Sequence, residues 1–222
     1  MTTRGAARAM TAFVFIDLDG VLTDSAEGIT RSIAYALDEM SLPVPGNETL
    51  RSFIGPALQE TFPKLGVEDV DRAIALYRER YTTVGLYESA AYEGTAEMLD
   101  ALAGMGYRLA LATAKPISYA AKITAHYGFD RRMAAQFGSE MDGRRTDKRE
   151  LLAYALETTG ADPGASYMIG DRMHDARGAL ANGITPLGAL WGFGAREELE
   201  AAGCAAIADA PLDIAALVKD LR

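Results

Sequence analysis

The stretch AFVFIDLDG at residues 12–20 decides the fold of the chain. Its first part is a short apolar run rich in aromatic and branched side chains, which is typical of a strand buried on both faces of a parallel sheet. The run ends in Asp17, Leu18, Asp19 and Gly20. Because side chains alternate along a strand, Asp17 and Asp19 should start on one face, where close carboxylates repel each other. An isolated turn of this kind is more often a solvated acidic pair, so the interpretation depends on the rest of the chain.

Similar apolar runs recur later in the chain, at residues 107–113, 165–170 and 184–189, with a short edge strand at 205–208. Helical patterns separate them, at residues 95–103, 117–127, 147–159, 173–182 and 196–202. Strands that alternate with helices favour right-handed βαβ units. The sequence therefore predicts an α/β fold with a doubly wound parallel sheet.

A long segment between the first and second strands has no strand character. It contains helical patterns at residues 26–40, 48–62 and 67–84, the second broken at Gly55-Pro56, and is punctuated by Pro43, Pro45, Gly46, Pro63 and Gly66. The segment is too long for one crossover connection. We therefore predict an inserted helical cap domain over residues 23–92, with residues 1–22 and 93–222 forming the α/β core. Such an insertion would lie over the carboxyl edge of the sheet, where α/β folds bind ligands.

A second acidic group follows the strand expected at residues 165–170. Asp171 and Asp175 stand where this strand leads into a helix, so the acids again face the ligand-binding edge. On a simpler interpretation, Asp171 is an N-cap of this helix and Asp175 is an acid of its first turn. Two acidic clusters, each after an apolar strand, are better explained by a shared Mg²⁺ site, because Mg²⁺ prefers oxygen ligands.

Phosphate recognition is the third expected element. Thr113 ends its strand and is followed by Ala114, Lys115 and Pro116, where free amides and a hydroxyl can bind an anion. Pro116 suits the first position of a helix. Lys148 lies in the basic run at residues 144–149, which by itself is normally a solvated surface charge.

In chain order, these four pieces are similar to the four motifs of the haloacid dehalogenase superfamily. Residues 17–25 match the first motif, Thr113 the second, Lys148 the third, and Gly170-Asp171 with Asp175 the fourth. The sequence resembles in particular the branch that contains phosphoglycolate phosphatases and 5′-nucleotidases with a helical cap, through FIGPALQETF at residues 53–62 and GDRMHDARGA at residues 170–179.

The resemblance implies a role for each acidic residue. Asp17 would attack phosphorus to form an aspartyl-phosphate, and Asp19 would protonate the leaving alcohol and then activate water. Mg²⁺ would be held by Asp17, the backbone carbonyl of Asp19 and Asp171, with Asp175 as a further ligand or a support of the site.

The resemblance also implies that Thr113, Ala114 and Lys148 bind the phosphoryl oxygens. Relatives often carry Lys-Pro at the third motif, whereas Lys148 is followed by Arg149. Lys115 precedes a proline, so both lysines stand as candidates for the phosphate-binding lysine. The fourth motif contains Arg172 and His174, which are bulkier than the residues common there and have no assigned role.

The implied function is that of a Mg²⁺-dependent phosphatase, a phosphoric monoester hydrolase acting on a phosphoglycolate-like compound or a nucleoside monophosphate. The alternatives are a sugar phosphomutase on the same fold and a noncatalytic binding or regulatory protein, although the latter should have lost a motif residue. A dehalogenase would lack the acid–base Asp19. The cap should select the substrate, with Arg51, Gly55 and Gln59 as candidate selecting residues.

Composition limits the partners. The chain has 22 basic and 31 acidic side chains and a net charge of −9, which argues against nucleic-acid binding. No apolar stretch approaches the length of a membrane span, and residues 1–10 are interpreted as a leader ahead of the first strand. Cys204 is the single cysteine, so no intrachain disulfide forms, in keeping with the cytoplasm. We expect a small phosphorylated metabolite as partner, no membrane or nucleic acid, and a monomer or homodimer.

Overall fold

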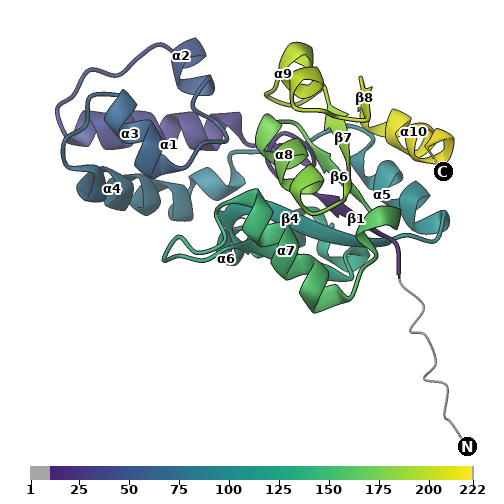
Figure 1. Ribbon diagram of the computed structural model, residues 1–222. Coiled ribbons are helices and arrows are strands. Elements are labelled where there is room, and N and C mark those ends of the chain that lie inside the picture. Colours follow the sequence, from purple (N-terminus) through teal and green to yellow (C-terminus); the bar gives the residue numbers. More distant parts are fainter. Residues whose placement is uncertain (1–10, 222) are drawn as a thin grey trace, which may run out of the picture.

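A parallel β-sheet forms the centre of the α/β body in the computed structural model, which describes residues 11–221 (Figure 1). The leader expected at residues 1–10 lies outside the described residues. Within the described part the sheet has six strands in the order β5-β4-β1-β6-β7-β8, and every neighbouring pair is parallel. The strands are β1 Phe13–Ile16, β4 Arg108–Pro116, β5 Ala135–Ser139, β6 Tyr167–Gly170, β7 Thr185–Ala189 and β8 Ala206–Ala208. The central position of β1 explains why all four of its side chains are buried, as the apolar run predicts.

Helices cover both faces of the sheet. Phe13 and Phe15 pack with the helices α7 (Lys148–Thr159) and α8 (Met173–Ala181), while Val14 and Ile16 belong to the apolar core on the opposite face. That second face is covered by α5 (Thr95–Gly104), α6 (Ile117–Tyr127) and α10 (Ile214–Asp220), and the short α9 (Arg196–Ala201) packs beside α8. Alternate residues of β1 therefore serve two cores, which confirms the predicted doubly wound α/β fold.

A helical body lies beside the sheet and is entered directly after β1 (Figure 1). Its helices are α1 Ala26–Glu39, α2 Asn47–Arg51, α3 Leu58–Lys64 and α4 Val70–Thr83, followed by the short 3-10 helix η1 Gly85–Tyr87. The strands β2 (Thr23–Asp24) and β3 (Ala90–Ala91) pair antiparallel where the chain enters and leaves. We call this body the cap, and its exact limits at residues 23 and 92 stay a prediction.

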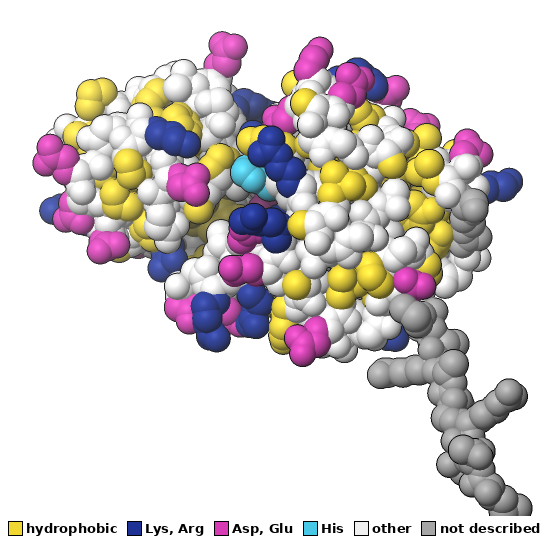
Figure 2. Space-filling model, in the orientation of Figure 1, with side chains coloured by type: hydrophobic (Ala, Val, Ile, Leu, Met, Phe, Trp, Pro, Cys, Tyr) yellow, Lys and Arg dark blue, Asp and Glu magenta, His cyan; other side chains and the backbone are white. Residues whose placement is uncertain are grey.

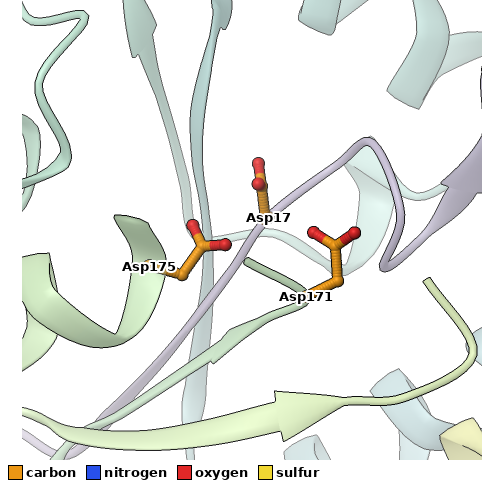
Figure 3. Close-up of side chains that lie close together, drawn as sticks. All are labelled: Asp17, Asp171 and Asp175. Carbon is orange, nitrogen blue, oxygen red and sulfur yellow. The ribbon is translucent and has the colours of Figure 1, made fainter. Parts of the chain in front are cut away.

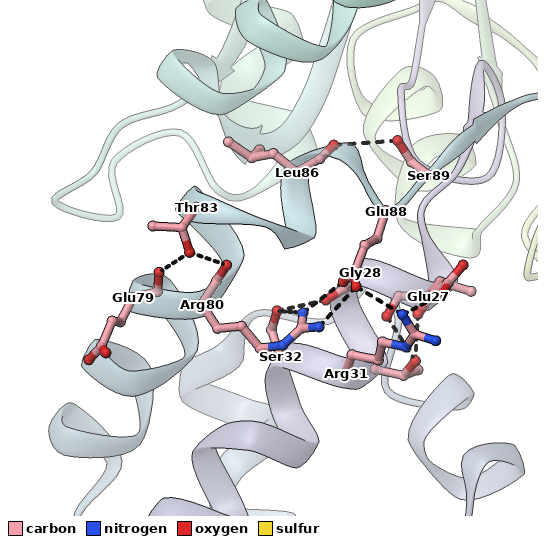
Figure 4. Close-up of polar contacts among 12 residues, drawn as sticks. Glu27, Gly28, Arg31, Ser32, Glu79, Arg80, Thr83, Leu86, Glu88 and Ser89 are labelled. Atoms are coloured by element: carbon pink, nitrogen blue, oxygen red, sulfur yellow. Dashed lines mark hydrogen bonds and ion pairs between the residues drawn. The ribbon is translucent and has the colours of Figure 1, made fainter.

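An ion-pair network holds the return segment of the cap to its helices (Figure 4). The guanidinium of Arg80 on α4 contacts both carboxylate oxygens of Glu88, at 2.7 and 2.9 Å, and Arg31 on α1 donates to the same carboxylate at 2.9 Å. The backbone of Glu88 also accepts a hydrogen bond from the Gly28 amide at 2.9 Å. These contacts, led by the hydrogen bond from Arg80, lower the pKa of Glu88. Glu88, in the segment that leaves the cap, is thereby bonded to both α1 and α4.

The structure corrects several predicted element bounds. The break predicted at Gly55-Pro56 separates two helices, α2 and α3, whereas Pro63 lies inside α3 rather than between helices. Pro63 stands one residue before the end of α3 and removes one backbone N–H donor there. β4 continues to Pro116, which precedes α6 as its N-cap instead of starting it. The edge strand β5 and the helix α10 were not expected from the sequence; β5 begins with two half-buried residues, so its apolar signal is weak.

No helix within residues 11–221 is both long and apolar enough to cross a membrane.

Candidate active site

Asp17 stands at the carboxyl end of β1, directly beside the end of β6. Its backbone amide donates to the carbonyl of Ile169 at 3.0 Å, and its Oδ1 accepts from the Leu18 amide at 2.8 Å. The chain then turns sharply at Gly20, which has a φ of +82°. A Cβ atom at Gly20 would collide with the carboxylate of Asp171, so this position requires glycine for both its conformation and its space.

The second acidic pair comes from the loop after β6, which contains Asp171, and from the first turn of α8, which contains Asp175. Asp171 is 1% exposed, and its Oδ2 accepts a hydrogen bond from the Phe193 amide at 2.8 Å. Asp175 is 2% exposed, and its Oδ2 accepts from the amide of Arg172, the N-cap residue of α8, at 3.2 Å. Asp175 is therefore a first-turn acid that accepts from the N-cap amide, as the simpler interpretation of the sequence predicts. Asp171 is not the N-cap, because Arg172 takes that position.

Asp17, Asp171 and Asp175 converge on one point (Figure 3). One carboxylate oxygen from each lies within 4.8 Å of the others. Burial raises the pKa of Asp17 to about 6, even though the Lys148 ammonium opposes this rise. Burial, followed by the charges of Asp175 and Asp17, raises the pKa of Asp171 well above its usual range. Three hard oxygen donors that destabilise one another fit a divalent cation such as Mg²⁺.

Lys148 supplies a positive charge to this cluster from the first turn of α7. Its Nζ lies 3.1 Å from Asp17 Oδ2 and 2.5 Å from Asp175 Oδ1, and it donates to the carbonyl of Ala112 at 2.7 Å. Burial favours the neutral amine, but the two carboxylates more than offset it and raise the pKa of Lys148. Lys148, and not Lys115, is thus the lysine that the fold brings to Asp17.

Lys115 has a different partner. Its Nζ donates to Asp19 Oδ1 at 2.7 Å and to the hydroxyl oxygen of Tyr81, on the cap helix α4, at 2.6 Å. The expected repulsion between Asp17 and Asp19 is therefore resolved differently than predicted. The Asp19 carboxylate is paired with Lys115, and the acidic cluster takes its third carboxylate from Asp175 instead.

The remaining phosphate-binding candidates lie at the end of β4. Thr113 is 2% exposed and its side chain lowers the pKa of Asp17, and its Oγ1 accepts a hydrogen bond from the Lys115 amide at 3.3 Å. Thr113 and Ala114 both line the cavity that contains Asp17. The structure therefore brings Thr113, Ala114 and Lys148 to the cavity that contains Asp17, and their binding of phosphoryl oxygens stays a prediction.

A cavity of about 690 Å³ lies between the cap and the α/β body, with Asp17 and Asp19 in its wall. Gly55 and Gln59 line this cavity, as expected for residues that meet a substrate. Arg51 does not, because it faces a separate pocket beside Asp24 and Ser89. The α2–α3 connection carries Gly55 toward the core, whereas Arg51 ends α2 and is exposed on another side.

Arg172 links the loop between β6 and α8 to the cap, a contact that the sequence did not reveal. Its Nη1 donates to the carbonyl of Ile54 at 2.6 Å, and its Nε lies 2.9 Å from Glu198. Gly55, with a φ of +111°, lies against this guanidinium, and a Cβ there would come within 3.1 Å of Nη1. The only sequence signal was an arginine between two acids in a loop. His174 is exposed and also lines the cavity.

Basic side chains from both bodies contribute to the lining of the cavity. Arg78 of the cap and Arg149 and Arg177 of the α/β body contribute to the lining. Figure 2 shows Lys and Arg side chains at the hollow between the two bodies. The lining also contains the acidic residues Glu60, Glu140 and Asp147, so the cavity wall carries charges of both signs.

Comparison with known proteins agrees with this geometry. Residues 14–189 match the sequence pattern described as haloacid dehalogenase-like hydrolase. A 5′-nucleotidase of Pseudomonas aeruginosa is 44% identical over 85% of this chain and 86% of its own. A tyrosine-protein kinase, PtkA, of Mycobacterium tuberculosis is 37% identical over 82% of this chain, which spans 62% of that protein. A crystal structure from Clostridium acetobutylicum, described as a predicted phosphatase, superposes with a TM-score of 0.90 at 33% identity, covering 96% of this chain and 100% of the other.

A doubly wound core with paired acids at the ends of β1 and β6 and a helical cap defines a class of hydrolases. The chain belongs to the haloacid dehalogenase-like hydrolases. Its relatives also include a pyrophosphatase and phosphoglycolate phosphatases. The names of the 5′-nucleotidase and the phosphoglycolate phosphatases support a phosphoric monoester hydrolase.

Proposed function

We propose that the protein is a Mg²⁺-dependent phosphatase that hydrolyses a small phosphomonoester through an aspartyl-phosphate on Asp17. One observation carries the proposal. The Asp17 carboxylate lies in the wall of a cavity, within reach of two further carboxylates and of the ammonium group of Lys148. A strand end that served only stability would gain nothing from burying three acids together.

The two chemical steps use Asp17 and Asp19. In the first, a carboxylate oxygen of Asp17 attacks phosphorus and the bond from phosphorus to the ester oxygen breaks, while Asp19 gives that oxygen a proton. In the second, water attacks the aspartyl-phosphate, Asp19 takes a proton from the water, and the bond from Asp17 to phosphorus breaks. Inorganic phosphate and the alcohol are released, and both carboxyl groups return to their initial state.

Four groups of the chain would hold Mg²⁺: the carboxylates of Asp17, Asp171 and Asp175 and the backbone carbonyl of Asp19. The ion would neutralise the attacking carboxylate and the phosphoryl oxygens. Lys148 and the end of β4 would bind the other phosphoryl oxygens. Lys148 suits this task because its partners keep it protonated and it is 5% exposed.

The cavity favours a nucleoside 5′-monophosphate over phosphoglycolate as the substrate class. Its volume of about 690 Å³ falls in the range of sites for drug-sized ligands, roughly 300–1,000 Å³, and far exceeds a two-carbon acid. The aromatic side chains of Tyr77, Tyr81 and Tyr119 line it beside apolar residues of the cap, a surface suited to a sugar and a base. The relative that is 44% identical is itself named a 5′-nucleotidase.

A phosphate-release screen tests this function. The purified protein is offered nucleoside monophosphates, phosphoglycolate, sugar phosphates and p-nitrophenyl phosphate, with Mg²⁺ and with EDTA. We expect release with Mg²⁺ only, highest with a nucleoside monophosphate, and none from the Asp17→Asn variant. The exposed Asp38→Asn variant is the matched control and should equal the wild type. Absence of release from every phosphomonoester, including the activated aryl phosphate, would overturn the proposal.

A further inference from the structure

Lys115 is a buried charge that the proposed mechanism does not use. Its side chain is 7% exposed, and its Nζ is shared between Asp19 Oδ1 at 2.7 Å and the Tyr81 hydroxyl at 2.6 Å. The three residues come from three separate parts of the chain: the turn after β1, the end of β4, and the cap helix α4.

The end of β4 is shaped so that Lys115 can reach this position. The pairing of β4 with β5 shifts register between Thr113 and Pro116, which takes Lys115 out of the regular ladder. The backbone there lies against Gly138 of β5, where a Cβ atom would come within 2.7 Å of the Lys115 carbonyl. A larger residue at position 138 would therefore push the strand end, and the lysine with it, away from Asp19.

Tyr81 is itself held in place by the cap. Its ring stacks on Tyr77 at 5.2 Å between centroids and meets Tyr119 of α6 at 6.0 Å, and the side chain is 2% exposed. Its hydroxyl can therefore fix the position of the Lys115 ammonium only while α4 lies against the core. Burying an ion pair of this kind adds little net stability, since desolvation offsets the attraction between the charges. The arrangement thus calls for a role other than stability.

We propose that Lys115 is a positioning residue that holds the Asp19 carboxylate toward the leaving oxygen, and that Tyr81 makes this position depend on the closed cap. The inference rests on the proposed phosphatase function, because it assigns Lys115 a task in the transfer of a proton by Asp19. Lys115 acts through Asp19 and does not itself touch the reacting atoms.

Leaving-group dependence separates this role from a structural one. A series of ring-substituted phenyl phosphates keeps the size of the substrate nearly constant, while the leaving group changes from good, as in p-nitrophenyl phosphate, to poor, as in phenyl phosphate. Good leaving groups depart without a well-placed acid, and poor ones need it. General acid catalysis contributes about 10²–10⁴-fold, so partial misplacement of Asp19 should cost phenyl phosphate on the order of 10-fold more in kcat/KM than p-nitrophenyl phosphate.

The experiment compares Lys115→Met and Lys115→Arg with the wild type over this series at saturating Mg²⁺. Lys115→Met should steepen the dependence of log kcat/KM on the leaving group, and Lys115→Arg should restore part of the wild-type slope. Asp19→Asn gives the upper limit of the steepening. Lys122→Met, an exposed lysine of the neighbouring helix α6, is the matched control and should leave the slope unchanged.

Tyr81→Phe keeps the ring and removes one hydroxyl, so it tests the inference even where Lys115→Met fails to fold. It should steepen the slope in the same direction and by less. An equal loss for all substrates in the Lys115 variants, or an unchanged slope in Tyr81→Phe, overturns the positioning role. Failure of the wild type to release phosphate from any substrate of the series would instead overturn the proposed function.

Discussion

Replacing Asp17 with asparagine should stabilise the protein in the absence of metal ions. The reason is the unfavourable charge of the native carboxylate. Burial, partly opposed by Lys148, raises the pKa of Asp17 from 3.8 to about 6. Asparagine has nearly the same shape as a protonated aspartic acid and can still accept the hydrogen bond from the Leu18 amide, which is 2.8 Å long. It therefore removes the charge and keeps the local structure.

The size of the effect follows from the linkage between protonation and folding. Between pH 4 and 6 the folded protein binds more protons at Asp17 than the unfolded chain, so the free energy of unfolding falls as the pH rises and levels off above about pH 6. Each unit of pKa corresponds to about 1.36 kcal/mol, so the rise in the pKa of Asp17 lowers the free energy of unfolding by about 3 kcal/mol at pH 7. By the same relation, the raised pKa of Asp17 lowers the free energy of unfolding by only about 0.5 kcal/mol at pH 4.

Thermal unfolding in EDTA measures this difference. For a protein of this size, about 1 kcal/mol shifts Tm by roughly 2–4 °C, so Asp17→Asn should raise Tm by about 6–12 °C at pH 7 and by little at pH 4. Added Mg²⁺ should raise Tm of the wild type and leave that of the variant almost unchanged. Asp38→Asn, which removes an exposed charge, should shift Tm only slightly at either pH. A variant less stable than the wild type at pH 7 in EDTA, or equally stabilised at both pH values, would refute the electrostatic reasoning.

Three further predictions concern the residues around Asp17. Lys148→Met should abolish phosphate release and cost about 3–5 kcal/mol in urea unfolding, because it leaves buried carboxylates without their cation. Gly20→Ala should remove the Mg²⁺-induced rise in Tm and cost roughly 1–3 kcal/mol, since a Cβ there meets Asp171 at a backbone angle of +82°. Arg172→Ala should speed hydrogen exchange over residues 53–59, measured by mass spectrometry, because the 2.6 Å bond to the Ile54 carbonyl is lost.

Each of these variants has a matched control on the surface. Lys122→Met removes an exposed lysine, Gly46→Ala adds a methyl group where no atom lies within 4 Å, and Arg131→Ala removes an exposed arginine. The explanation for Lys148 fails if Lys148→Met and Lys122→Met have the same free energy of unfolding in urea. The explanation for Gly20 fails if Mg²⁺ still raises Tm of Gly20→Ala. Unchanged exchange over residues 53–59 in the Arg172 variant would show that its bond to the cap does not hold this segment.

The central strands could be predicted because strands buried on both faces consist of consecutive apolar residues. β1 is apolar at every position since both of its faces are covered, and β6 follows the same rule. The acids that end these strands could then be placed together, because parallel strands carry their carboxyl ends to one edge. β5 lies at the edge of the sheet, where only one side is paired and burial is partial, so its composition gave no comparable signal.

Contacts between distant segments could not be predicted in the same way. Local sequence does not distinguish Lys115 from Lys148 as the partner of Asp17. Lys115 lies at the carboxyl end of β4 and Lys148 begins α7, so both stand near the edge of the sheet where Asp17 lies. The choice depends on the packing of α7 against α8. There a Cβ at Gly178 would come within 2.7 Å of the Lys148 side chain, so the glycine lets α7 approach the acidic cluster. Likewise, Arg172 donates to the carbonyl of Ile54 only because the cap packs against the core.

The two lysines of the site are held by different parts of the protein. Lys148 is fixed by core groups alone, the carbonyl of Ala112 and the carboxylates of Asp17 and Asp175, so it keeps its position whether or not the cap is closed. Lys115 is fixed partly by Tyr81 of the cap and should lose that partner on opening. In the proposed mechanism, an open cap would thus leave the phosphate-binding charge in place while loosening the group that positions Asp19. Proton transfer would then be restricted to the closed state, in which the cap excludes bulk water from the aspartyl-phosphate until Asp19 is in position.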